Sequence, residues 1–395
     1  MSDNQPKPRE FDAVLGGKAP PPANGLVLGG LEGVKQRLKS SVARERAAAL
    51  IDALRHREEG LNLLVEALQD SSEQVQLFAS RLLRQRGGNK GKQALLRHNP
   101  WLFFTKLEEW KFEDFYSDIG ITASVTIACS VDLGQYLDEF KALLQDPLVS
   151  KVEALACTIT DDIHRGSRTF INTLCKACRQ LTSLKVLSIR DYRDPDNKSR
   201  LYLSDISSVL EAYPYLEVLE IWGSLGGKSD FRRFQHNCLK TLIIGGIVET
   251  VDISYQPLTQ IFALDLPALE YLELWGGYSR GRGIDSLKPL LTGQPFPSLC
   301  YLGLPHFEDT DKLIEAIAQS PILARLTVLD ISLGELTDKG AEILLKCPAI
   351  NQLHTLNVAK NCLSTEMVQR LAKLNCRVIA EPQHESEHRY YALNE

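Results

Sequence analysis

The sequence predicts an α/β protein in which an all-α segment precedes a curved parallel sheet built from repeats. Apolar residues recur at helical spacing between residues 31 and 82. A phrase of the form L-x-x-L-x-L, or a close variant, then recurs eight times between residues 152 and 358. At 395 residues the chain is also too long for one ordinary core, which fits two domains or an elongated repeat array.

The first part of the chain is expected to be irregular and then helical. Residues 1–29 are rich in Gly, Pro and Ala and bury too little apolar surface to offset the entropy of ordering. Within residues 30–98, four stretches place their apolar residues on one helical face. The stretch LKSSVARERAAAL resembles LQDSSEQVQLFAS about thirty residues later, which predicts two stacked helical hairpins. Ser71 and Gln74 have the spacing of a capping box for the fourth helix.

The predicted helices resemble a known type of helical repeat. Small Ala residues at the inner turn with Leu pairs behind them resemble HEAT-like repeats of the phycobilin-lyase type, over about residues 25–98. The stretch FDAVLGGKAPPPANGLVLGGLEGVKQRL, followed later by NPWLFF, looks like the helical module at the front of many cyanobacterial multidomain proteins. The resemblance implies an all-α HEAT-like solenoid that acts as an interaction adaptor. It also leaves open an accessory factor or lyase-like chaperone for bilin or phycobiliprotein handling.

Residues 99–120 form an aromatic-rich joint between the two predicted domains. They include seven aromatic residues, too many for a solvated linker because each would bury on the order of 150–250 Å². Two interpretations stay open: a hydrophobic joint that fixes the helices to the next domain, or a segment that docks a partner.

The repeated phrase begins at residues 152, 184, 216, 239, 269, 299, 326 and 353. Such spacings, with one short strand and one helix per unit, are typical of a leucine-rich-repeat horseshoe with a parallel sheet. The last two units resemble the ribonuclease-inhibitor type, with Thr337 and Ser364 as helix N-caps and Asn361 in the asparagine position of the pattern. We expect this domain to span residues 121–395, with ITASVTIACS and RYYALNE as capping strands. The span is similar to a family of uncharacterised bacterial leucine-rich-repeat proteins, which implies a fold and no activity.

The repeats predict three rows of side chains on the concave face, because residues between the inward leucines point to the opposite side of each strand. The first row is Ala154, Val186, Val218, Thr241, Tyr271, Tyr301, Val328 and Thr355. The second is Ala156, Ser188, Glu220, Ile243, Glu273, Gly303, Asp330 and Asn357. The third, just past the strands, includes Thr158, Arg190, Trp222, Gly245 and Trp275.

The centre of these rows is the candidate partner-binding surface. The near-copies LEVLEIWG and LEYLELWGG place Trp222 and Trp275 two strands apart, about 10 Å, with Gly245 between them, which predicts a slot with indole walls. We expect both indoles to be partly exposed; the alternative is that each packs under the glycine loop that follows it. The predicted anchors are Trp222, Trp275, Tyr271 and Tyr301, with Glu220, Glu273 and Asp330 orienting basic groups of the partner and Arg190 at one margin.

Several motifs suggest chemistry, but their context argues against it. His384 to His388 satisfies H-E-x-x-H in a charged, Pro-preceded stretch without an evident third ligand. The run Gly227-Lys228-Ser229 lacks the first glycine of a phosphate loop. Cys175 and Cys178 form C-x-x-C on a helical pattern without a second pair. The group Asp161, Asp162 and His164 has no nucleophile nearby. We therefore expect no catalytic residues, metal or cofactor.

Composition narrows the function further. The net charge of -5 argues against nucleic acid, and the lack of a long apolar run argues against a membrane span. Nine cysteines without framework spacing and a polar N-terminus favour a reducing cytoplasm. The sequence therefore predicts a cytoplasmic, non-enzymatic scaffold or adaptor that binds a protein or peptide partner on the concave face of its repeats.

Overall fold

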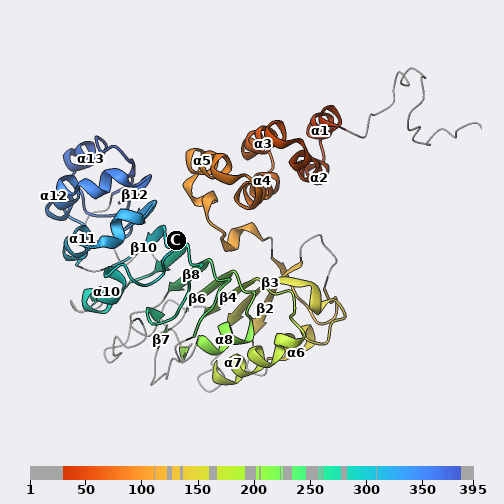
Figure 1. Cartoon of the computed structure of the whole chain (residues 1–395). Coiled ribbons are helices and arrows are strands. Elements are labelled where there is room, and N and C mark those ends of the chain that lie inside the picture. The colour runs from red at the N-terminus through yellow and green to blue at the C-terminus, as the bar shows by residue number, and fades with distance from the viewer. Residues whose placement is uncertain are drawn as a thin grey trace, which may run out of the picture. The chain divides into compact units, whose positions relative to one another are not determined.

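The structure is a computed structural model of the whole chain, and it divides into two compact units, residues 1–91 and 92–395 (Figure 1). Each unit is described by itself. The described residues are 30–110, 112–121, 127–133, 137–159, 167–191, 202–203, 206–222, 224–225, 234–245, 258, 261–276, 283–307 and 309–383.

The first unit contains the four predicted helices. They are α1 Leu31–Arg37, α2 Ala43–Ala53, α3 Arg57–Glu66 and α4 Glu73–Arg86, with 3-10 turns η1 Leu54–His56 and η2 Ala67–Gln69. Helix α2 packs against α1, α3 and α4, and buried Leu and Val side chains fill the space between them. A fifth helix, α5 Gly88–His98, begins after α4 and was not predicted, because three of the four residues in its first turn, GNKG, are Gly or Asn, which favour turns over helices.

The predicted capping box is wrong. The N-cap of α4 is Ser72, and its side chain makes no capping bond. Instead, Oδ1 of Asp70 accepts from the backbone N of Ser72 at 2.8 Å. The Asp70 carboxylate is also held by Arg46 of α2, whose Nη2 and Nε donate at 2.7 and 2.8 Å. The Arg46 guanidinium lowers the pKa of Asp70, so an ion pair between the hairpins replaces the local cap.

Within the described residues, the second unit is built on a parallel sheet of eleven strands. Their order is β1-β2-β3-β4-β6-β8-β9-β10-β11-β12-β13. Their bounds are β1 Glu113–Asp114, β2 Ile127–Leu133, β3 Val152–Ile159, β4 Val186–Asp191, β6 Val218–Trp222, β8 Thr241–Gly245, β9 Tyr271–Leu274, β10 Tyr301–Gly303, β11 Val328–Asp330, β12 Thr355–Asn357 and β13 Arg377–Ile379. A separate pair, β5 Tyr202–Leu203 and β7 Ser224–Leu225, is also parallel.

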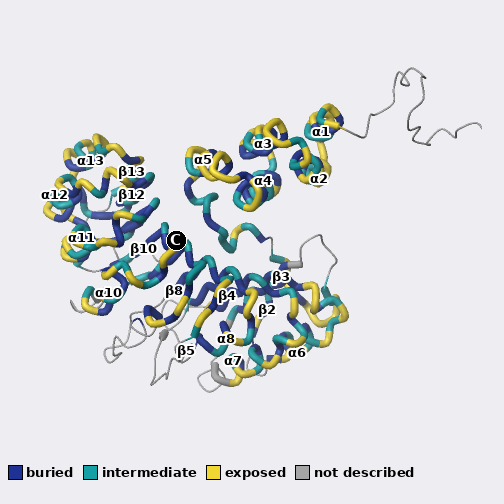
Figure 2. The backbone as a smooth tube through the Cα atoms, in the orientation of Figure 1, coloured by how far each residue is buried: buried dark blue, intermediate teal, exposed yellow. Residues whose placement is uncertain are grey.

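Helices lie along one side of this sheet, on the outer side of the arc that the strands follow (Figure 1). They are α6 Asp138–Leu143, α7 Ser167–Lys176, α8 Ser207–Ala212, α10 Gly283–Leu291, α11 Thr310–Ala318, α12 Asp338–Lys346 and α13 Thr365–Leu371. Short 3-10 helices are η3 Pro100–Phe103, η4 Leu107–Glu109, η5 Val149–Lys151, η6 Ala177–Arg179, η7 Pro321–Arg325 and η8 Pro348–Gln352. The repeat leucines form one continuous core between sheet and helices, and Figure 2 shows this burial along the strands.

The predicted helix starts and asparagine position are confirmed. The hydroxyl groups of Thr337 and Ser364 accept from Lys339 N and Met367 N at the starts of α12 and α13. Asn361 is fully buried; its Nδ2 donates to three backbone carbonyls, and its Oδ1 accepts from Leu336 N at 3.0 Å.

The ends of the sheet differ in part from the prediction. Strand β2 and helix α6 form the expected beginning of the array. The predicted closing strand RYYALNE lies outside the described residues, and in the described part β13 pairs in parallel with β12. Strand β1 precedes β2 at the other edge. Both extra strands were missed because each is only two or three residues long and shows no alternating pattern.

Candidate functional site

The strand register matches the predicted rows. In the first row, Ala154, Val186, Val218, Thr241, Tyr271, Tyr301, Val328 and Thr355 are Cα partners from strand to strand. The second row pairs in the same way, from Ala156 to Asn357. We call the face that carries these rows, opposite the helices, the inner face.

The first row is not an open surface, which corrects that expectation. Residues 99–110, here named the cover segment, pack across the inner face. Phe104 joins a buried cluster with Ile243, Tyr271, Tyr301 and Val328. Trp110 joins a second cluster with four small first-row and edge residues, Ala128, Ala154, Val186 and Val218. Between them, the Thr241 hydroxyl donates to the carbonyl of Thr105 at 2.5 Å. Aromatic side chains of the cover segment therefore bury much of the first row.

Tyr271 and Tyr301 form the centre of the sealed region. Their rings stack at 3.8 Å between centroids and 10° between planes, and Phe104 meets both edge-on at 5.3 Å. The two tyrosines are 0% and 1% exposed. Burial raises the pKa of both phenols well above the ordinary value. In this structure, therefore, the two tyrosines contact the cover segment and not solvent.

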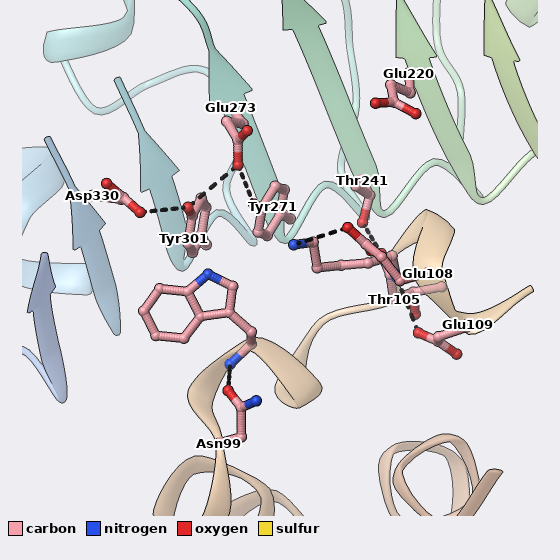
Figure 3. A network of polar contacts seen from close by, with 12 residues as sticks. Asn99, Thr105, Glu108, Glu109, Glu220, Thr241, Tyr271, Glu273, Tyr301 and Asp330 are labelled. Atoms are coloured by element: carbon pink, nitrogen blue, oxygen red, sulfur yellow. Dashed lines mark hydrogen bonds and ion pairs between the residues drawn. The ribbon is translucent and has the colours of Figure 1, made fainter. Parts of the chain in front are cut away.

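The hydroxyl groups of both tyrosines contact carboxylates (Figure 3). Tyr271 Oη donates to Glu273, and Tyr301 Oη lies between Glu273 Oε2 at 3.4 Å and Asp330 Oδ2 at 3.3 Å. Asp330 is buried and also accepts from Asn357 Nδ2 and from the backbone N and hydroxyl of Ser332. Burial raises the pKa of Glu273 despite these hydrogen bonds. Glu273 and Asp330 are the Cα partners of Gly303 on the two neighbouring strands. The lack of a side chain at Gly303 leaves room for the Tyr301 ring and Glu273.

The cover segment contributes a cation to this region. Lys106 Nζ lies 5.5 Å from the centroid of the Tyr271 ring and 3.6 Å from Glu108 Oε1. Its positive charge lowers the pKa of Glu273, partly offsetting the effect of burial. The backbone N of Lys106 donates to Glu109 at 3.0 Å, which fixes the turn around it.

Glu220 is buried and forms its own group of contacts on β6. Its carboxylate accepts from Arg190 Nη2 at 2.9 and 3.0 Å, from Ser188 Oγ at 2.9 Å and from Trp222 Nε1 at 2.5 Å. The Arg190 side chain is 50% exposed. Arg190 therefore lies at the margin of the candidate surface, as predicted, and neutralises the buried Glu220 carboxylate.

Trp222 and Trp275 are both partly exposed, which confirms that expectation, but they do not form a slot. Their ring centroids lie 5.1 Å apart at 55°, so the indoles contact each other. The Trp222 ring covers Gly245, where an added Cβ would lie 2.2 Å from a ring carbon. The missing side chain of Gly245 thus makes room for an indole and not for a ligand. Trp275 Nε1 donates to Glu273 at 2.6 Å, as Trp222 does to Glu220.

The motifs that suggested chemistry give no site in the described residues. No group of three or more His, Cys, Asp or Glu side chains there is arranged to hold a metal. Cys175 lies on α7 and Cys178 on η6, and neither belongs to such a group. The other three motifs, at residues 161–164, 227–229 and 384–388, lie outside the described residues. Burial raises the pKa of the Cys300 thiol, next to the cover segment, to about 12, which keeps it protonated and unreactive.

The rows of side chains were predicted from the sequence, but the residues that cover them were not. Phe104, Thr105, Lys106 and Trp110 were assigned to a joint, and their position on the inner face was not predicted. The seven aromatic residues were the available signal, because so much apolar area needs a surface to bury it.

Comparison with known proteins adds little beyond the fold. No protein-family model matches the chain, and no curated protein matches it either. A crystal structure of a protein from Bacteroides fragilis is similar over 62% of this chain and 70% of that chain, with 25% sequence identity and a TM-score of 0.52. An internalin from Listeria monocytogenes aligns over 89% of this chain and 98% of that chain, with 12% identity and a TM-score of 0.30.

The class of protein follows from the architecture itself. In the part of the chain that the structure describes, eleven parallel strands, inward leucines at each repeat and helices along one side define a leucine-rich-repeat-like fold. Among the helices of the described residues, none is both long and apolar enough to cross a bilayer.

Proposed function

We propose that this chain is a non-enzymatic scaffold that binds a protein partner at the edge of its inner face, where β4, β6 and β9 end. The contact between the partly exposed Trp222 and Trp275 carries this proposal. Tryptophan is enriched among the residues that dominate protein interfaces. Here each indole is also held in place by a carboxylate two residues earlier, so little side-chain freedom remains to be lost on binding.

The cover segment supports this location. It covers much of the first row, which leaves the partly exposed third-row side chains of Arg190, Trp222 and Trp275 available to a partner. Small-molecule sites are usually enclosed, whereas a row of partly exposed side chains along strand ends suits a protein surface. The Glu220 carboxylate at this edge already accepts from Ser188, Arg190 and Trp222, which fixes it as a structural group.

The first unit has a supporting role in the proposal. Its stacked helical hairpins, with α2 packed on α3 and α4, support a HEAT-like repeat module that acts as an adaptor. The nine cysteines have no framework spacing in the sequence, which is consistent with the reducing, cytoplasmic location that forms part of this proposal.

The proposal is tested by affinity capture from lysate of the cells that make the protein, followed by mass spectrometry. The test variant is Trp222→Ala with Trp275→Ala. A milder variant, Gly245→Ala, keeps both indoles but displaces the Trp222 ring. The control is Tyr215→Ala, which removes a side chain that is 72% exposed.

We expect a set of proteins captured by the wild type and the Tyr215 variant, with recovery reduced at least tenfold by the double variant and less by Gly245→Ala. A loss of about 2 kcal/mol, typical of interface hot spots, corresponds to roughly 30-fold in affinity. Circular dichroism checks that each variant is folded. Equal capture of the same proteins by the folded double variant would refute the proposal.

A further inference from the structure

The inner face carries two copies of one element, a glutamate followed two residues later by a tryptophan. Glu220 and Trp222 form it on β6, and Glu273 of β9 forms it with Trp275, which directly follows that strand. In both copies the indole Nε1 donates to the carboxylate, at 2.5 and 2.6 Å. The two copies therefore have the same local geometry and invite a direct comparison of what surrounds them.

The first copy holds a guanidinium. Arg190 is the Cα partner of Trp222 on the preceding strand, β4. Its Nη2 donates to both oxygens of Glu220 at 2.9 and 3.0 Å, and its Nε lies 3.3 Å from Ser188 Oγ. The first glutamate is thus neutralised within the chain by a half-exposed arginine.

The second copy lacks the equivalent group. On the preceding strand, β8, Ile243 is the Cα partner of Glu273 and takes the position of Ser188, while Gly245 takes the position of Arg190. Among the described Lys and Arg residues, none forms an ion pair with Glu273; Arg190 and Lys240 pair with Glu220 and Glu217. Lys106 lowers the pKa of Glu273 without an ion pair between them, and its Nζ lies 5.5 Å from the centroid of the Tyr271 ring.

The chemistry of the second copy suits a cation. A carboxylate offers about four acceptor sites, and the donors Tyr271 Oη and Trp275 Nε1 use two of the four on Glu273. The single proton of Tyr301 Oη lies between Glu273 and Asp330, at 3.4 and 3.3 Å. An indole whose N–H donates to an anion has a more electron-rich ring, and tryptophan is already the best aromatic partner for a cation. The two indole rings in contact therefore present a negative surface beside a carboxylate without an ion pair in the described residues.

We propose that Glu273 and Trp275, with the Trp222 ring beside them, bind an arginine side chain of the protein partner. It would give the second copy what Arg190 gives the first. Arginine fits better than lysine because a planar guanidinium binds a carboxylate through two hydrogen bonds and stacks on an aromatic ring. This inference rests on the proposed function, because it names the group that the partner presents to the two tryptophans.

The test uses the full chain labelled with 5-fluorotryptophan. Its four tryptophan resonances are assigned by single Trp→Phe changes. Ethylguanidinium chloride is the probe, propylurea is its neutral isostere, and sodium chloride controls for ionic strength. We expect saturable shifts of the Trp275 and Trp222 resonances with ethylguanidinium alone. Glu273→Gln should weaken this binding at least tenfold while the Trp101 and Trp110 resonances keep their positions.

A second variant keeps the test decisive if Glu273→Gln does not fold. Arg190→Ala removes a half-exposed side chain and leaves Glu220 and Trp222 without their guanidinium. Ethylguanidinium should then fill the vacated place, so this variant should bind a second equivalent that shifts Trp222 most. Shifts of equal size with propylurea, no saturable shift in the wild type, or no second equivalent in Arg190→Ala would each overturn the inference.

The outcome also separates the two proposals. If the tryptophan variants lose the partner but ethylguanidinium does not bind, the scaffold proposal stands and the arginine inference fails. If ethylguanidinium binds at Trp275 but capture does not depend on either tryptophan, the cation site is real and the scaffold proposal fails.

Discussion

Each glutamate on β6 and β9 orients the tryptophan that follows it because residues two apart in a strand point to the same side. Glu220 and Glu273 therefore reach the Nε1 groups of Trp222 and Trp275 without any change in the backbone. The doubled phrase in the sequence encodes this pairing twice. Gly245 on the strand between then lets the two indoles meet, since any side chain there would collide with the Trp222 ring.

Glu273 should give the folding stability a measurable pH dependence. Burial raises its pKa in the folded protein above the ordinary value of 4.5. As pH rises from 4.5 through the folded pKa, the unfolded chain has released this proton and the folded chain has not, so Glu273 increasingly opposes folding. We expect the stability of the wild type, relative to Glu273→Gln, to fall in this window by up to about 1.4 kcal/mol per pH unit. Urea unfolding at a series of pH values measures the difference.

Glu342 is the matched control, because its pKa shifts in the opposite direction. The hydrogen bond from Arg370 lowers the pKa of Glu342. Its contribution is therefore present above pH 4.5 and is lost as pH falls through the folded pKa. Relative to Glu342→Gln, the wild type should gain stability with rising pH. A difference for Glu273→Gln that rises with pH, as for Glu342, would contradict the burial argument.

At the scale of elements, the cover segment behaves as part of the core. One hydrogen bond, from Thr241 to the carbonyl of Thr105, links its backbone to the first row in the described residues. Side-chain burial therefore holds it: Phe104 is 1% exposed and Trp110 is 7% exposed. Large apolar side chains dominate such packing because the gain scales with buried apolar area.

Phe104→Ala should therefore destabilise the second unit strongly. It removes the ring that meets both Tyr271 and Tyr301 and leaves a cavity above their stack, for which we expect a loss of about 3–5 kcal/mol. The control variant is Tyr116→Ala, six residues after the end of the cover segment. It removes a side chain from a residue that is 53% exposed and should change stability by less than about 0.5 kcal/mol. Equilibrium urea unfolding followed by far-ultraviolet circular dichroism measures both. Similar losses for the two variants would show that the cover segment does not pack as described.

The register of the rows could be predicted from the sequence, whereas the position of the cover segment could not. The register of Tyr271, Tyr301 and Val328 follows from a local period, because each leucine phrase fixes its own strand and side chains alternate between faces. The cover segment has no such period. Its contact between Thr105 and Thr241 spans 136 residues, and only the folded sheet brings them together. The exposed indoles were predictable, but their contact over Gly245 depended on rotamers that spacing does not set.

At the scale of the whole molecule, the packing of the cover segment determines where the second unit begins. Contacts divide the chain at residues 91 and 92, which places the cover segment with the leucine-rich repeats. The sequence placed the start of that domain at residue 121, because the repeat pattern gives no reason to include an aromatic stretch without strands. A boundary drawn from repeats alone therefore leaves out residues that seal the inner face.

Two shortened chains should therefore behave differently. A chain of residues 88–395 keeps α5 and the cover segment and should unfold cooperatively, with the near-ultraviolet circular dichroism of packed tyrosines. A chain of residues 121–395 lacks Phe104 and Trp110, so Tyr271, Tyr301 and the apolar first row become exposed to solvent. We expect it to bind a hydrophobic dye, to self-associate and to melt lower by roughly 10 °C or more, since several large buried side chains are lost together. Equal melting temperatures without dye binding would mean that the repeats are complete without the cover segment.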